Sequence, residues 1–177
     1  MKSLRPESAL PRISNGNLGF LRKFGFLTKG AANALVLGEE AVAHSLRDMG
    51  LSVDLLNMRE MRPCSLVRDE TLQAMSARGA EYDLVLLVFP EFESDAQRHL
   101  VLQSLPDFVR GGGLLMIHGL SERHQGCEVN GFSTADLHAR FALFDVLDVA
   151  DYDDVFGPGY NSDVLYAVVD FVGRKMS

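Results

Sequence analysis

The sequence predicts an α/β fold with one mostly parallel sheet, because apolar runs of strand length alternate with stretches of helical spacing. Residues 84–89 form a continuous apolar run, as in a parallel strand covered on both faces. A helix follows, started by Ser94 and Asp95, and residues 114–118 form a second apolar run. We expect glycines 111–113 to end that helix. A strand, a helix and a strand within about forty residues make a βαβ unit with a right-handed crossover.

The same alternation occurs earlier in the chain. Residues 34–37 predict a short buried strand, residues 39–49 a helix that Gly50 closes, and residues 51–57 a further strand. Gly38 stands at the turn from the first strand to the helix. These residues make a second βαβ unit, and ligands in open sheets of this kind lie beyond the carboxyl ends of the strands.

The carboxyl-terminal third predicts an antiparallel hairpin. A helix begins near Ser133, a strand spans residues 141–149 and the last strand spans residues 164–172, with a Gly-Pro-Gly turn at residues 157–159 between the two strands. We expect the last strand to insert into the sheet beside residues 141–149, antiparallel to its neighbours.

Length and charge predict one globular domain preceded by a basic segment. The 177 residues are too few for two typical domains and carry a net charge of −7. Residues 1–29 are nevertheless basic, with Glu7 as their one acidic residue, and predict a basic arm or a covering helix; residues 30–177 predict the α/β domain. An acidic body argues against nucleic acid as a partner.

The sequence shows no clear targeting segment, disulfide framework or metal-binding motif. No apolar run approaches the length of a membrane span, and the amino end lacks the apolar core of a signal peptide, so we expect a cytoplasmic protein without a membrane partner. Cys64 and Cys127 match no disulfide framework or metal motif, and the spacing of His118, His124 and Cys127 matches no zinc motif. We therefore predict no metal site.

The order of these segments resembles the class I S-adenosylmethionine-dependent methyltransferases, and within them the small bacterial tellurite-resistance methyltransferases. YDLVLLVF, a helix and GGGLLMI are similar to the family's strand four and its glycine-led strand five. FSTADLHARFALFDVLDV, FGPGY and VLYAVVDFVGRK are similar to its last helix, strand six and returning strand seven. The resemblance implies a shortened, single-domain, Rossmann-like methyltransferase sheet.

The resemblance also implies that S-adenosylmethionine lies across strand ends near Gly38, Glu39, Asn57, Phe89 and Pro90. The sequence departs from the family there. Only Gly38 remains of a G-x-G-x-G-like loop, and Asn57 stands where the family has a carboxylate for the ribose hydroxyls. Glu39 and its neighbour Glu40 would repel the carboxylate of the cofactor. We therefore expect that S-adenosylmethionine binds weakly or not at all.

The residues expected to face the methyl acceptor are Glu91 and His118. Glu91 follows the first central strand, and His118 ends the second. The resemblance implies that they face a small-molecule acceptor. The alternative interpretation is structural: Pro90 merely ends a strand, and His118 is a strand-end residue. Catalysis by alignment requires no covalent nucleophile, and we assign no catalytic residue from the sequence.

Two functional hypotheses remain open: a small-molecule methyltransferase, and a catalytically inactive module of the same fold that binds a small molecule or a protein partner. Under the second, Phe20, Phe24 and Phe26 would pack into the space between Gly38 and Phe89 that the missing glycine loop leaves. A flavodoxin-like or glutamine-amidotransferase-like fold also suits the central unit. That class needs a nucleophile at a strand-to-helix elbow, and the sequence shows none.

Overall fold

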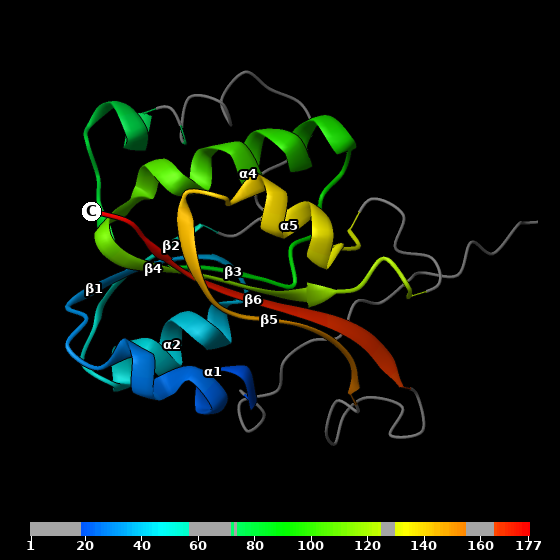
Figure 1. The fold of residues 1–177 in the computed structure, drawn as a ribbon. Helices are drawn as coiled ribbons and strands as arrows, with labels where there is room; N and C mark the ends of the chain where they lie inside the picture. The colour runs from blue at the N-terminus through cyan, green and yellow to red at the C-terminus, as the bar shows by residue number, and fades with distance from the viewer. Residues whose placement is uncertain (1–18, 57–71, 73, 125–129, 155–164) are drawn as a thin grey trace, which may run out of the picture.

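The computed structural model describes residues 19–56, 72, 74–124, 130–154 and 165–177. Within them, one six-stranded sheet has the order β2-β1-β3-β4-β6-β5 (Figure 1). Its strands are β1 (Asn33–Gly38), β2 (Ser52–Leu56), β3 (Tyr82–Val88), β4 (Val109–Leu120), β5 (Phe144–Asp154) and β6 (Tyr166–Lys175).

Four strands are parallel, and their register brings the carboxyl ends of three of them together. β1 pairs with β2 and β3, and β3 pairs with β4, all in parallel. Gly38 is opposite Val88, and Val88 is opposite His118. Every residue of β3 is buried, which confirms the interpretation of its apolar run as a strand covered on both faces.

The carboxyl-terminal hairpin is also confirmed. β6 pairs antiparallel with β4 on one side and with β5 on the other, so the last strand is inserted into the sheet. The strand bounds differ from those expected: Phe141 follows a helix, and β5 begins at Phe144 and continues to Asp154. The turn predicted at residues 157–159 and the start of the strand predicted from residue 164 lie outside the described residues.

The prediction that glycines 111–113 end a helix is wrong. The helix ends at Phe108, and these glycines lie inside β4. The register against β3 jumps there from Tyr82 opposite Val109 to Leu84 opposite Leu114, and Gly112 has a φ of 76°. Glycine accepts that conformation without strain, so the three glycines form a bulge at the start of a strand.

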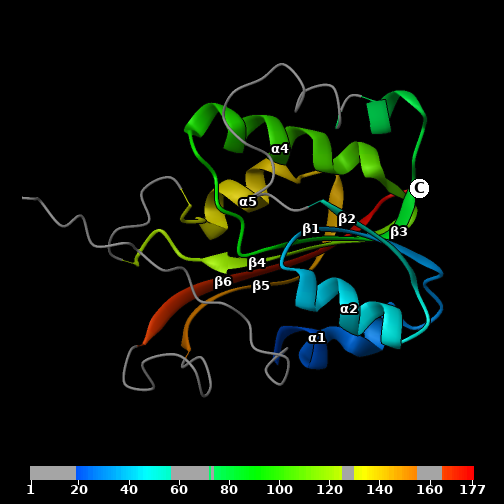
Figure 2. The same cartoon turned by 180° about the vertical axis from the view of Figure 1, so that it is seen from behind.

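Helices cover both faces of the sheet. α1 (Gly19–Phe24), the 3₁₀ turn η1 (Gly25–Thr28) and α2 (Glu40–Asp48) lie on one face, and α4 (Asp95–Phe108) and α5 (Thr134–Arg140) lie on the other (Figures 1 and 2). Each face has its own apolar core. Phe20, Leu21 and Phe24 bury one side of α1 against the first core. Among the described residues, no helix is both long and apolar enough to cross a membrane.

A buried aspartate holds the amino ends of the parallel strands together. The Asp83 carboxylate accepts hydrogen bonds from the backbone nitrogens of Ala32, at 2.6 Å, and Asn33, at 3.3 Å. Arg110 Nη1 lies 2.5 Å from its other oxygen. The polar groups at the amino ends of β1, β3 and β4 thus hold these three strands together. A ligand site is expected at the opposite side, beyond the carboxyl ends of the strands.

Candidate functional site

The carboxyl ends of β1, β3 and β4 bring several sequence-predicted residues together. Gly38, Val88 and His118 are adjacent across three strands, and the backbone nitrogen of Phe89 donates to the carbonyl oxygen of His118 at 2.8 Å. Pro90 is buried next to Phe89, and Glu91 is half-buried beyond it. Asn57 follows β2 and lies outside the described residues.

Gly38 is required by the approach of β1 to β3. Its φ of 128° is one that other residues rarely adopt. A Cβ at this position would overlap the carbonyl oxygen of Val88. The strand contact therefore explains this glycine whether or not a cofactor binds.

Glu39 and Glu40 supply negative charge at the start of α2. Glu39 is the N-cap residue, with extended backbone and no hydrogen bond from its side chain to the helix, and Glu40 lies in the first turn. Acidic groups are favourable at this end of a helix dipole. The same charges oppose an anionic ligand group there.

Phe89 is the strained residue of the site. Among the described residues it alone combines a side chain with a positive φ, 41°. Proline at the next position disfavours the right-handed helical region for Phe89. Residues held in sparsely populated conformations cost about 1–3 kcal/mol each and cluster at functional sites. This turn therefore marks the end of β3 as a candidate binding region.

His118 is almost fully enclosed, with 5% of its surface exposed. Its ring stacks on Phe20 at a centroid distance of 4.8 Å and meets the ring of Phe89 edge-on at 4.7 Å. Its Nδ1 lies 2.6 Å from a carboxylate oxygen of Asp170. The side chain expected to face an acceptor thus lies beneath α1.

Asp170 forms the centre of a polar network that sequence reasoning missed. Its carboxylate is fully buried and accepts from His118, from the hydroxyl of Tyr152 at 2.9 Å and from Lys23 Nζ at 3.1 Å. Lys23 also pairs with Asp148 at 3.2 Å. One sequence signal could have revealed the network: Asp170 is a charged residue within the apolar run VVDFV.

The network sets the charge of Asp170, Tyr152 and Lys23. Burial alone would raise the pKa of Asp170, but hydrogen bonds from His118, Tyr152 and Lys23 outweigh it and hold that pKa below its usual value. Burial and the Asp170 charge raise the pKa of the Tyr152 hydroxyl. The pKa of Lys23 is also raised, because its two aspartates outweigh desolvation. The network therefore holds an anionic carboxylate, a neutral phenol and a cationic amine.

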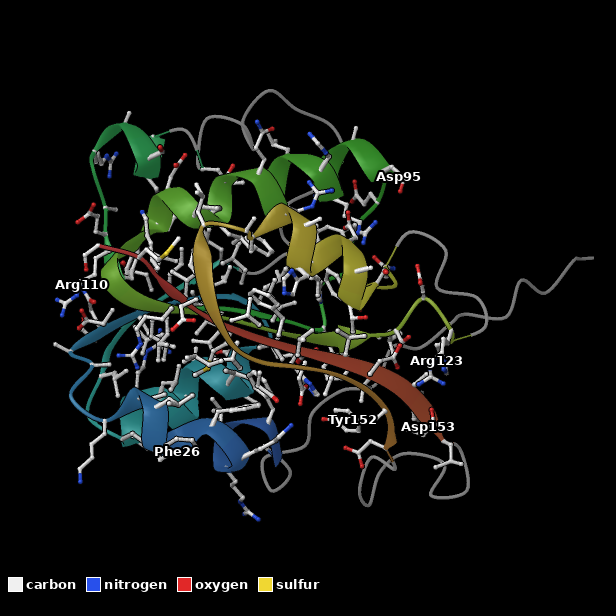
Figure 3. All side chains as sticks on the ribbon, viewed as in Figure 1. Phe26, Asp95, Arg110, Arg123, Tyr152 and Asp153 are labelled. Atoms are coloured by element: carbon white, nitrogen blue, oxygen red, sulfur yellow. The ribbon has the colours of Figure 1, made fainter. Side chains whose placement is uncertain are left out.

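A second polar group holds the residues directly after β4. Ser121 is fully buried and donates to Asp151 at 2.8 Å, while Arg123 binds Asp151 and Asp153 (Figure 3). The hydrogen bonds from Arg123 lower the pKa of Asp151. Part of the acidic run on β5 is therefore paired with Ser121 and Arg123.

The three aromatic residues expected to fill the site behave differently. Phe20 and Phe24 are buried and meet edge-on at 5.1 Å. Phe26 is 72% exposed and lies on the outer surface beside α1, so the expectation for that residue is wrong (Figure 3). The turn into η1 directs Phe26 away from the sheet. Phe20 reaches the carboxyl ends of the strands through His118, which in turn contacts Phe89.

No protein-family model matches the sequence, and no curated protein is significantly similar to it. Solved structures do match. A S-adenosylmethionine-dependent methyltransferase from Anabaena variabilis aligns with a TM-score of 0.61 at 12% identity, over 93% of this chain and 86% of its own. TehB from Haemophilus influenzae aligns with a TM-score of 0.58 at 10% identity, over 92% of this chain and 63% of its own.

A third similar structure is a release-factor-specific protein-(glutamine-N5) methyltransferase from Alicyclobacillus acidocaldarius. It aligns with a TM-score of 0.54 at 16% identity, over 99% of this chain and 100% of its own. Identities this low show a shared fold and leave the acceptor open. The chain has the mostly parallel, Rossmann-like fold of the class I S-adenosylmethionine-dependent methyltransferases, with the antiparallel carboxyl-terminal hairpin of that sheet.

Proposed function

We propose that the protein is a S-adenosylmethionine-dependent, methyltransferase-like protein that acts on a small molecule and binds its cofactor weakly. The observation that carries the proposal is the strand order β2-β1-β3. The chain leaves β1 to form β2 on one side and returns to form β3 on the other, so the topological switch point lies between Gly38 and Phe89. Ligands of open α/β sheets bind at this point.

The residues that the resemblance assigns to the cofactor suit it only in part. The backbone at Gly38 and the start of α2 would hold the methionine portion, Asn57 the ribose, and Phe89 with Pro90 the side nearest the methyl group. Glu39 and Glu40 oppose the cofactor's carboxylate. Asn57 offers one carbonyl acceptor in place of a carboxylate, and each charged hydrogen bond lost costs about 1.5–3 kcal/mol. Weak binding follows from these two features.

Calorimetric titration with S-adenosylmethionine and S-adenosylhomocysteine tests the proposal. We expect weak binding by the natural chain and about tenfold or tighter binding after Asn57→Asp, because the new carboxylate can accept from both ribose hydroxyls. Glu39→Gln is expected to strengthen binding as well, by removing a repulsive charge. Glu122→Gln, at an exposed residue after β4, is the control and should change nothing. Absence of binding heat in the natural chain and in Asn57→Asp would refute the proposal.

A catalytically inactive binding or assembly module is the second candidate. The observation that favours it is the aromatic series Phe20, His118 and Phe89, which places a side chain of α1 over the ends of β3 and β4. If α1 only obstructs a working site, Phe20→Ala should increase the affinity for S-adenosylmethionine. Failure of Phe20→Ala and Asn57→Asp to bind the cofactor would support the inactive module, whose partner would then be a protein or another small molecule.

A further inference from the structure

Two arginines on the face of the sheet opposite α1 are largely enclosed but lack the hydrogen bonds that such groups require. Arg98 of α4 and Arg140 of α5 have side chains that are 20% and 25% exposed. The Nε atom of each is buried and has no hydrogen-bond partner among the described residues. Buried polar groups are nearly always hydrogen-bonded, so two unpaired Nε–H donors at one place indicate a site for an external acceptor.

The contacts that the two guanidinium groups do make are long. One carboxylate, Asp136 in the first turn of α5, lies between them, 3.9 Å from Arg98 and 3.4 Å from Arg140. Nη1 of Arg140 also lies 3.4 Å from Nδ1 of His99. Hydrogen bonds from a cationic nitrogen to an anionic oxygen are about 2.7–2.9 Å long. Among the described residues, therefore, neither guanidinium group has a close acceptor.

The two arginines are nevertheless held in position. The guanidinium carbon of Arg98 lies 5.5 Å from the centre of the fully buried Phe132 ring, which attracts the cation. Arg140 is held by its contacts from α5 to α4, and the two helices lie side by side on the same face of the sheet (Figures 1 and 2). A pair of guanidinium groups that is already placed loses little conformational freedom when a ligand binds.

The charge of this pair favours an anion. Arg98 and Arg140 both remain cationic, and Asp136 is the one carboxylate among the described residues that contacts them. Asp95, labelled in Figure 3, precedes Arg98 by one turn of α4, is exposed and makes no ion pair among the described residues. The cluster therefore has an excess of positive charge, opposite in sign to the net charge of −7 of the whole chain.

We propose that Arg98 and Arg140 bind the phosphate group of a small phosphate monoester between α4 and α5. A phosphate monoester carries about −1.5 to −2 charges and three acceptor oxygens, so both guanidinium groups can donate to it through Nε–H. A carboxylate has only two oxygens and matches one guanidinium group. Asp136, whose side chain is 41% exposed, turns to solvent as the phosphate takes its place. The exposed sides of the arginines leave room for the ester group. The inference does not rest on the proposed methyltransferase function.

Binding is tested first by ¹H–¹⁵N NMR of the arginine Nε–H groups, with methyl phosphate, inorganic phosphate and acetate as probes at one ionic strength. The two signals are assigned by their loss in Arg98→Lys and Arg140→Lys, which keep the charge and remove the planar fork. We expect methyl phosphate to shift both signals as hydrogen bonds form, at lower concentration than acetate does. Equal responses to methyl phosphate and acetate, or a response to inorganic phosphate without one to methyl phosphate, would overturn the proposal.

The affinity for methyl phosphate is then compared among variants. We expect about tenfold weaker binding in each lysine variant, because each loses charged hydrogen bonds, and tighter binding in Asp136→Asn, which lacks the competing carboxylate. Arg78→Lys, at an exposed arginine before β3, is the control and should bind as the natural chain does. Methyl phosphate should also raise the Tm of the natural chain more than that of either lysine variant, which separates loss of the site from loss of the fold. Unchanged affinity in both lysine variants, or weaker binding in Asp136→Asn, would overturn the proposal.

Discussion

Gly38 illustrates a residue whose role in the fold and role in a site coincide. It ends β1, has a positive φ and leaves no room for a Cβ beside Val88. The glycine that the resemblance assigns to a cofactor loop is thus already required by the pairing of β1 with β3. Replacement of this residue would affect stability before it affects any ligand.

Gly38→Ala is therefore expected to destabilise the protein by about 3 kcal/mol or more, from backbone strain together with overlap on the Val88 carbonyl. Gly50→Ala is the matched control, because Gly50 also has a positive φ, 93°, but no atom of the described residues other than its chain neighbours lies within 4 Å of its Cβ position. We expect a cost of about 1 kcal/mol there. Urea unfolding of both variants gives the comparison, and equal costs would show that the overlap is relieved by a small shift of the strand.

The ionisation of the buried Asp170 is coupled to folding. Its folded pKa is depressed, so its contribution to stability is present above the unfolded value of about 3.9 and is lost as pH falls through the folded value. Below about pH 4 the unfolded chain binds more protons at this position than the folded one. Acid should therefore destabilise the natural chain partly through Asp170.

Asp170→Asn is expected to lower stability at pH 7 by on the order of 3 kcal/mol, because Lys23 and His118 lose a charged acceptor. Between pH 5 and pH 3 the stability of the variant should fall less than that of the natural chain, because the variant lacks the carboxyl group whose pKa is lowered by folding. Urea unfolding across this pH range measures both effects. Asp107→Asn, at an exposed position in α4, is the control and should keep the natural pH dependence. An unchanged acid dependence in Asp170→Asn would contradict the assignment.

At the scale of elements, α1 depends on the sheet for its existence. A helix of six residues is too short to be stable alone, so packing must hold it. Phe20, Leu21 and Phe24 supply apolar contacts, and Lys23 adds the ion pairs to Asp148 and Asp170. The Phe20, Lys23 and Phe24 side chains lie on one side of the helix because their spacing follows its period.

Phe24→Ala is expected to destabilise the protein by about 3 kcal/mol, because it empties a buried site beneath α1. It should not create methyltransferase activity. Phe26→Ala removes an exposed ring of the same size and should stay within about 0.5 kcal/mol of the natural chain. Thermal and urea unfolding test the pair, and similar losses in both variants would mean that α1 packs differently in solution.

At the scale of the whole molecule, the central strands of the sheet are hydrogen-bonded on both sides, whereas the edge strands are hydrogen-bonded on one side. β3, β4 and β6 each have a neighbour on both sides, whereas β5 has β6 as its one partner among the described strands. Exposed acidic residues along β5, Asp145 among them, disfavour edge-to-edge pairing with another chain. The free energy of local opening should therefore be highest for the central strands and lower toward β5.

Amide hydrogen exchange should show this gradient. We expect the amides of β3, β4 and β6 to exchange only on global unfolding, and the amides of α1 to exchange through a local opening of lower free energy. Alternate amides of β5 that face away from β6 should exchange early. Exchange of β6 as fast as α1 would contradict this gradient, because it would show that the inserted strand opens locally at low free energy.

The sequence by itself determined the layers of this protein. Apolar runs at residues 84–89 and 114–118 are buried strands because a parallel strand between two helical layers tolerates few polar side chains. The inserted hairpin was predictable from its place after the last helix and from the family resemblance. The role of glycines 111–113 was not, because one Gly-Gly-Gly segment suits a helix end and a strand bulge equally.

Only the tertiary structure decided what surrounds the candidate site. Lys23, His118, Tyr152 and Asp170 are far apart in the chain, and they meet because α1 packs across β4, β6 and β5. Local patterns report the period of one segment, whereas a hydrogen bond between strands depends on register and on the helix that covers them. The sequence could thus name His118 as a strand-end residue, and only the packing of α1 placed Phe20 on its ring and Asp170 at its nitrogen.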